Sequence, residues 1–210
     1  MHIPDGFLNI EVALATYIAA ALILVIALKR AKKIMGEKHV PLLSVLAAGV
    51  FSAQMLNFPL IGIGGTSGHF LGAALSAIVL GPYGAVIVMA LVLVVQALVF
   101  ADGGITALGA NVVNMGVVGG FGAYVVYYML LRTTKNVWAA AFFAGWASVV
   151  FAAAMCAIEI GLSEMSEIMT VLFAMIPIYA VMGVIEGAVT AGVLTAIQRT
   201  RQDILALEKI

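Results

Sequence analysis

The sequence is poor in charge, in cysteine and in histidine. Charged residues make up 10% of its 210 residues, whereas about 25% is usual for a soluble domain. The net charge is zero, so no basic surface for nucleic acid is indicated. Cys156 is the single cysteine and lies in an apolar run, which excludes an internal disulfide framework and favours a buried filler. Few side chains are therefore left to carry chemistry.

Apolar residues take the place of the missing charges and make up 64% of the chain. The charges are clustered, which leaves apolar runs long enough to cross a hydrocarbon core of about 30 Å. The N-terminus lacks the basic segment and the cleavage site of a signal peptide. We predict an all-α integral membrane protein forming one domain over residues 1–210. Its seven transmembrane helices are expected at about 9–28, 41–60, 68–81, 83–101, 109–131, 137–159 and 169–198.

The third and fourth of these helices depend on a break at Gly81-Pro82-Tyr83-Gly84. No charge occurs between His69 and Phe100, and one helix of that length would reach about 48 Å, too long for an ordinary span. With the break, all ten lysines and arginines fall on one side of the membrane. By the positive-inside rule the N-terminus is then outside and the C-terminus cytoplasmic.

Two common kinds of active site are missing from the sequence. It contains no GxxxxGK[ST] phosphate-binding loop, so the chain cannot energise transport with ATP by itself. It also contains no HExxH pattern, which argues against an intramembrane zinc enzyme. We therefore expect no catalytic residues and no enzymatic activity.

The three histidines are His2, His39 and His69. His39 lies beside a lysine and is expected to be a solvated cytoplasmic loop residue, whereas His2 and His69 fall on the outer side. A histidine at position two can chelate a metal with the Met1 amine, its own backbone amide and its imidazole Nδ1. That chelate suits metals that accept planar nitrogen, such as Ni²⁺, Cu²⁺ and Co²⁺. His69 is the remaining outer imidazole for the fourth corner; a simpler two-histidine site is the alternative.

Several other polar residues are predicted at membrane depth, where they are costly. Interhelical hydrogen bonding is one interpretation, and support of the metal ligands from a second layer is the other. The supporting candidates are Thr66, Ser67, Gln96, Asn111 and Asn114. Glu159 and Glu186 suggest a different function, a proton-coupled secondary metal transporter.

Four motifs together resemble the substrate-binding components of cobalt and nickel energy-coupling factor (ECF) transporters, the CbiM/NikM type. The resemblance covers nearly the whole chain, and the motifs read Met1-His2-Ile3-Pro4-Asp5-Gly6-Phe7-Leu8, Gly64-Gly65-Thr66-Ser67-Gly68-His69, Gln96-Ala97-Leu98-Val99-Phe100-Ala101-Asp102-Gly103-Gly104 and Leu108-Gly109-Ala110-Asn111-Val112-Val113-Asn114-Met115-Gly116. The resemblance implies metal ligation by Met1, His2 and His69. Where cobalt members carry Met-Glu and Ser-His-Pro-Thr-Gly, this sequence has Pro4-Asp5 and Ser67-Gly68-His69-Phe70, which favours nickel over cobalt.

The resemblance also implies a place and partners for the protein. It would lie in a prokaryotic cell membrane as a multi-pass substrate-specificity subunit that captures Ni²⁺, or Co²⁺ for cobalamin biosynthesis. Its partners would be a transmembrane coupling subunit, a pair of ATPases and, in some systems, a small additional membrane subunit.

Overall fold

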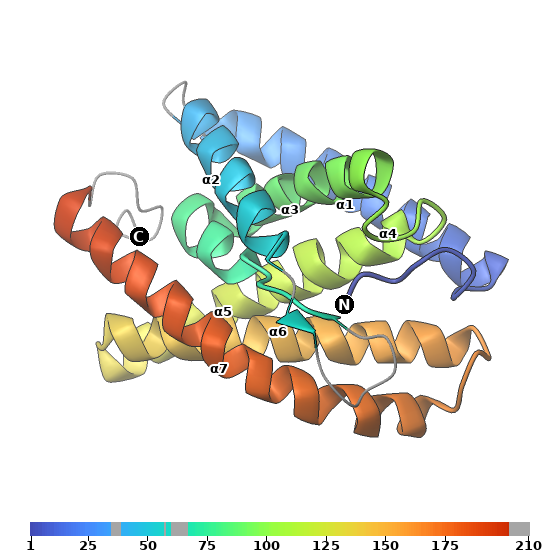
Figure 1. Cartoon of the computed structure of the whole chain (residues 1–210). Coiled ribbons are helices and arrows are strands. Elements are labelled where there is room, and N and C mark those ends of the chain that lie inside the picture. Colours follow the sequence, from blue (N-terminus) through green and yellow to red (C-terminus); the bar gives the residue numbers. More distant parts are fainter. Residues whose placement is uncertain (35–38, 57, 60–66, 202–210) are drawn as a thin grey trace.

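The computed structural model describes residues 1–34, 39–56, 58–59 and 67–201 (Figure 1). Helices form this part of the chain apart from one short antiparallel pair of strands, β1 (Phe58–Pro59) and β2 (Ser67–Gly68). The helical elements are α1 (Ile10–Ile34), α2 (His39–Gln54), α3 (Ala73–Val95), η1 (Gln96–Phe100), α4 (Leu108–Asn111), η2 (Val112–Gly119), α5 (Gly120–Thr134), α6 (Val137–Leu162) and α7 (Ile168–Thr200). The predicted all-α class is confirmed.

Five helical stretches in the described residues are long and apolar enough to cross a membrane. They are residues 10–33, 73–100, 108–134, 137–162 and 168–200, with α2 as a shorter apolar helix.

Two predicted helix bounds were wrong. The second helix stops at Gln54 rather than near 60, because the chain leaves it for the β1–β2 pair. The third begins at Ala73 rather than 68, since β2 and a non-helical segment that ends in left-handed Gly72 precede it.

The chain breaks its helical path at Gly81, as the turn signal predicted. Gly81 has φ 78° and ψ 168°, a conformation open to glycine because it lacks a Cβ, and Pro82 follows without an N–H to donate. A helix over residues 73–80 is therefore joined to a second one that continues from Pro82 through η1 to Phe100.

Several polar side chains lie buried inside this bundle, and many large apolar side chains lie on its outside. Gln54, Gln96, Asn111, Glu159 and Glu186 are all buried. Large apolar side chains point outward from several helices, for example Ile10, Val99, Phe173 and Val181. This distribution suits a protein surrounded by hydrocarbon, where an exposed leucine costs nothing and an exposed amide is expensive.

Candidate metal-binding site

The first residues of the chain fold back into the bundle instead of projecting from it (Figure 1). Met1 and Ile3 are 6% and 1% exposed. The Ile3 amide donates to Asn111 Oδ1 (2.8 Å), and the Ile3 carbonyl accepts from Asn111 Nδ2 (3.2 Å) and from the Gly104 amide (2.8 Å). The backbone directly after His2 is thus fixed by a helix and by a loop.

At the rim of the site, Asp5 fastens the same segment to the loop before α4. Its Oδ1 accepts from the amide (2.7 Å) and the hydroxyl (2.6 Å) of Thr106, and these bonds lower the pKa of Asp5. The approach of the two segments is close: a Cβ at Gly104 would lie 2.3 Å from the Asp5 nitrogen and 2.6 Å from the Pro4 carbonyl carbon. Glycine is needed there for contact with the N-terminal segment.

The His2 imidazole is oriented by Gln96, at the start of the π-helical turn η1. His2 Nε2 lies 3.1 Å from Gln96 Oε1. An amide oxygen accepts and does not donate, so Nε2 carries the proton and Nδ1 keeps its lone pair. Burial, followed by the nearby N-terminal amine, lowers the pKa of His2 to about 4, so the ring is neutral near pH 7. Nδ1 is the nitrogen that a chelate with the His2 amide would use.

His69 lies against His2, with 4.6 Å between the ring centroids. His69 Nδ1 is 2.8 Å from the Phe70 carbonyl oxygen and therefore donates, which leaves the lone pair on Nε2. Among the described residues, buried Nε2 has no hydrogen-bond partner. Burial lowers the pKa of His69 well below its ordinary value. Both rings are thus neutral and each keeps an available lone pair.

The backbone just after His69 is held by two buried side chains. Both oxygens of Glu186 accept main-chain amides, from Leu71 (2.9 Å) and from Gly72 (2.8 Å). Gln54 Nε2 donates to the Leu71 carbonyl (2.7 Å). Non-helical backbone is tolerated at membrane depth only where such partners satisfy it. Glu186, which the sequence suggested for proton coupling, thus holds the segment that carries His69.

The Met1 amine is fully buried and donates to the Tyr179 hydroxyl at 2.6 Å. Burial lowers the pKa of this amine, which favours the neutral form that can bind a metal. In the described residues no three His, Cys, Asp or Glu side chains gather into a metal-holding group. The buried Met1 amine is therefore a candidate further ligand for a metal at the two histidines.

The remaining predicted supporting residues lie in different places. Gln96 and Asn111 contact the N-terminal segment, as described above. Asn114 does not: its Nδ2 donates to Glu159 Oε2 (2.6 Å), an interhelical bond. Thr66 lies outside the described residues, and Ser67 belongs to β2, whose backbone pairs with β1.

Sequence reasoning missed Tyr179 and the role of Asp102. Tyr179 lies within an apolar helix and carried no signal for a contact with the amine of Met1. Asp102 belongs to one of the quoted motifs, but the sequence alone indicated no role for it. Its Oδ1 lies 3.6 Å from His2 Nδ1.

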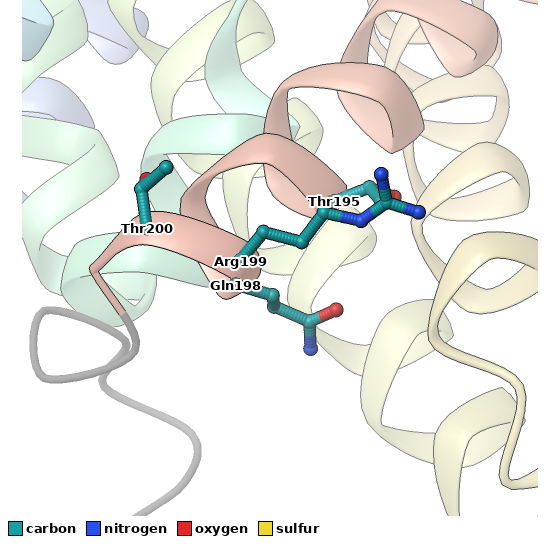
Figure 2. Close-up of a pocket in the computed structure, with 4 residues that line it drawn as sticks. All are labelled: Thr195, Gln198, Arg199 and Thr200. Atoms are coloured by element: carbon teal, nitrogen blue, oxygen red, sulfur yellow. The ribbon is translucent and has the colours of Figure 1, made fainter.

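A hollow of about 520 Å³ lies elsewhere, at the C-terminal end of α7 (Figure 2). Thr195, Gln198, Arg199 and Thr200 line it. Arg199 is 13 residues beyond Glu186 on the same helix, or about 20 Å along its axis. Its lining offers no imidazole, so we do not assign it to the metal.

The chain matches known proteins along nearly its whole length. It is 45% identical over 207 residues to a putative fused nickel transport protein of Archaeoglobus fulgidus, covering 98% of this chain and 68% of that protein. It is 44% identical to a putative metal transport protein of Haloquadratum walsbyi (98% and 93%). It is 33% identical to a cobalt transport protein of Sorangium cellulosum (98% and 94%).

A solved structure and a family description agree with these relatives. The crystal structure of a truncated transition metal transporter superposes with a TM-score of 0.88 at 32% identity, covering 95% of this chain and 99% of the other. Residues 2–204 match the family described as the cobalt uptake substrate-specific transmembrane region, CbiM. This chain is therefore a multi-pass membrane protein that belongs to the CbiM family of cobalt and nickel transport proteins.

Proposed function

We propose that this protein captures Ni²⁺, or less readily Co²⁺, at the outer face of a prokaryotic cell membrane, as the substrate-specificity subunit of an ATP-driven ECF transporter. The metal is the transported substrate, not a resident cofactor. Its ligands are the Met1 amine, the His2 amide, His2 Nδ1 and His69 Nε2. The carrying observation is that two adjacent neutral rings each keep one nitrogen free of a hydrogen bond to a fixed partner. The other nitrogen of each ring donates its N–H to a carbonyl oxygen, His2 Nε2 to Gln96 and His69 Nδ1 to Phe70. The ring centroids lie 4.6 Å apart.

The covalent chain supports the two remaining ligands. His2 has one residue before it, so its amide closes a five-membered ring with the Met1 amine and a six-membered ring with Nδ1. Four nitrogens in this arrangement favour a metal ion that prefers square-planar coordination. The name of the Archaeoglobus fulgidus relative supports nickel, and that of the Sorangium cellulosum relative supports cobalt at lower identity.

We further propose seven membrane crossings, with the N-terminus outside. The third crossing consists of the helix over 73–80, about 12 Å long, and the non-helical residues 70–72 that precede it. Most residues of this stretch are buried, so protein shields the short crossing from lipid. The break at Gly81 supports this count because it separates the stretch from the next crossing.

The secondary-transporter alternative has less support. Both oxygens of Glu186 are engaged by backbone amides, and Glu159 accepts from Asn114. The test is uptake in vesicles with and without co-purified ATPase and coupling subunits. The proposal expects ATP-dependent uptake when all subunits are present and none from this chain alone. Uptake driven by a proton gradient in this chain alone would favour the alternative.

The ligand set is tested by comparing Ni²⁺ binding to three forms of the protein: native, acetylated at Met1, and extended by one residue before Met1. Intact mass establishes first that the native form carries a free Met1 amine. Acetylation removes the donor capacity of the amine without altering a side chain. We expect a large loss of affinity in both modified forms and a yellow-orange, diamagnetic Ni²⁺ complex in the native one. Equal affinity in all three forms would leave the two-histidine site.

A further inference from the structure

We propose that Asp102 is the charge-balancing carboxylate of this site: it lies beside the bound ion without ligating it and attracts the hydrated cation from outside. This inference rests on the proposed function. Asp102 belongs to one of the motifs, but it is not among the four nitrogen ligands, so its role is otherwise unexplained.

Asp102 is built into the same local structure that orients His2. The π-helical turn η1 begins with Gln96, and it ends where Ala101 adopts a left-handed conformation (φ 52°). The Asp102 amide donates to the Gln96 carbonyl at 3.1 Å. One turn of chain therefore positions the group that holds His2 Nε2 and the carboxylate that faces His2 Nδ1. π-Helical turns of this kind occur frequently at functional sites.

The Asp102 side chain is more exposed than the His2 side chain that it faces. Oδ1 is 3.6 Å from His2 Nδ1, and the Asp102 side chain is 27% exposed against 6% for His2. Among the described residues, the other oxygen, Oδ2, is buried and has no hydrogen-bond partner. A partly exposed carboxylate at the mouth of an otherwise enclosed nitrogen site is suited to meet an incoming cation.

Counting charges gives the carboxylate a reason to be there. The divalent ion contributes two positive charges, the deprotonated His2 amide removes one, and the neutral amine and imidazoles remove none. One positive charge remains, and an isolated buried charge is expensive. Asp102 supplies the missing negative charge, so the loaded site becomes neutral.

The distance argues for a neighbour of the metal and not for a fifth ligand. Two donors at right angles around a metal, each about 2.0 Å from it, lie about 2.8 Å apart. The observed 3.6 Å between Oδ1 and Nδ1 is longer. The carboxylate therefore interacts with the metal electrostatically and through bridging water. The four nitrogens alone form the coordination plane.

The experiment measures Ni²⁺ association by stopped flow and Ni²⁺ affinity by titration, using the purified full chain. Asp102→Asn removes the charge at nearly constant shape, and Asp102→Glu keeps the charge. Glu11→Gln, an exposed acid in the first turn of α1, is the matched control. We expect Asp102→Asn to lower both the association rate and the affinity by about tenfold or more, and to flatten the fall of the rate with salt. Asp102→Glu should recover part of the loss, and Glu11→Gln should bind like the native protein.

The absorption spectrum separates charge balance from a role in shaping the site. At saturating Ni²⁺, Asp102→Asn should keep the planar-nickel spectrum of the native protein, because all four nitrogens remain. Loss of that spectrum would overturn the proposal by making Asp102 a structural support. Native rates and affinity in Asp102→Asn, alongside weakened binding in His69→Ala, would also overturn it while leaving the nitrogen site intact. Absence of Ni²⁺ binding in the native chain would instead refute the proposed function.

Discussion

At the scale of single residues, the site depends on which nitrogen of each ring is free. Gln96 Oε1 accepts a hydrogen bond from His2 Nε2–H, and the Phe70 carbonyl accepts one from His69 Nδ1–H. Each ring therefore keeps a different nitrogen free, Nδ1 in His2 and Nε2 in His69, on two rings that lie against each other. Neutral imidazole is the form that ligates metals, and burial keeps both rings neutral.

His69→Ala should remove one of the four proposed ligands while the three-nitrogen chelate at the N-terminus stays. We expect Ni²⁺ affinity to fall by about a hundredfold or more, since loss of a supporting residue alone usually costs 10–100-fold. His39→Ala is the matched histidine control and should leave affinity unchanged. Titration checks the affinity, and gel filtration in detergent checks the fold. Native affinity in the variant would remove His69 from the ligand set.

Gln96→Met should keep the volume of the side chain but remove the oxygen that fixes the His2 ring. The ring can then rotate or change its tautomer, so affinity should fall by about 10–100-fold. Gln198→Met, at the far end of α7, is the control. A variant with unaltered Ni²⁺ affinity would show that the chelate orients His2 unaided.

At the scale of elements, the N-terminal segment packs against the loop from Asp102 to Thr106. Gly104 is the point of closest approach, and an added methyl group there has no room. Gly104→Ala should displace Pro4 and Asp5 and weaken Ni²⁺ binding. Gly192→Ala is the control, because a Cβ at that helical position meets nothing within 4 Å. Protease protection of the N-terminus, measured with Ni²⁺ titration, tests the prediction; equal values in both variants would contradict it.

Helix α7 contacts both segments of the site with residues on one of its faces. Tyr179, Met182 and Glu186 are spaced by three and four, which places them on the same side of the helix. They contact, in turn, the Met1 amine, Gly68 and the amides of Leu71 and Gly72. A single helix face thus positions both segments that carry the proposed ligands.

Glu186→Gln tests this positioning role against proton coupling. Glutamine replaces one acceptor oxygen with a donor, so one of the two backbone amides would lose its partner, at a cost of about 1–3 kcal/mol. We expect weaker Ni²⁺ binding together with a lower thermal unfolding temperature. Glu159→Gln should change both less, because glutamine can still accept from Asn114. If both variants bound Ni²⁺ normally and both lost uptake, proton coupling would be the better account.

At the scale of the whole molecule, the proposed orientation predicts which loops meet the outer solution. In a Cys156→Ala background, a cysteine at Ser166, between α6 and α7, should react with an impermeant reagent added outside intact cells. A cysteine at Thr133, at the end of α5, should react only after the membrane is opened. Both positions are exposed. External labelling at Thr133 would refute the seven-crossing arrangement.

The sequence by itself determined the membrane class, the apolar helices and the break at Gly81, because hydropathy and local turn chemistry are properties of short segments. It also proposed His2 and His69 as metal ligands, since three histidines left few choices, and this assignment stays a prediction. It erred at the end of α2 and the start of α3, because residues 58–59 pair with 67–68 as strands and the backbone of residues 71–72 bonds to buried side chains.

Only the tertiary structure decided what surrounds the two histidines. Tyr179, Asp102 and Glu186 are separated from Met1, His2 and His69 by long stretches of chain, and no local pattern links them. The choice of free nitrogen in each ring likewise depends on an acceptor placed by folding. The sequence determines which side chains carry nitrogen donors. The packing of α7, η1 and the N-terminal segment determines which ring nitrogen is hydrogen-bonded and which is free, because these bonds form between elements that are distant in the chain.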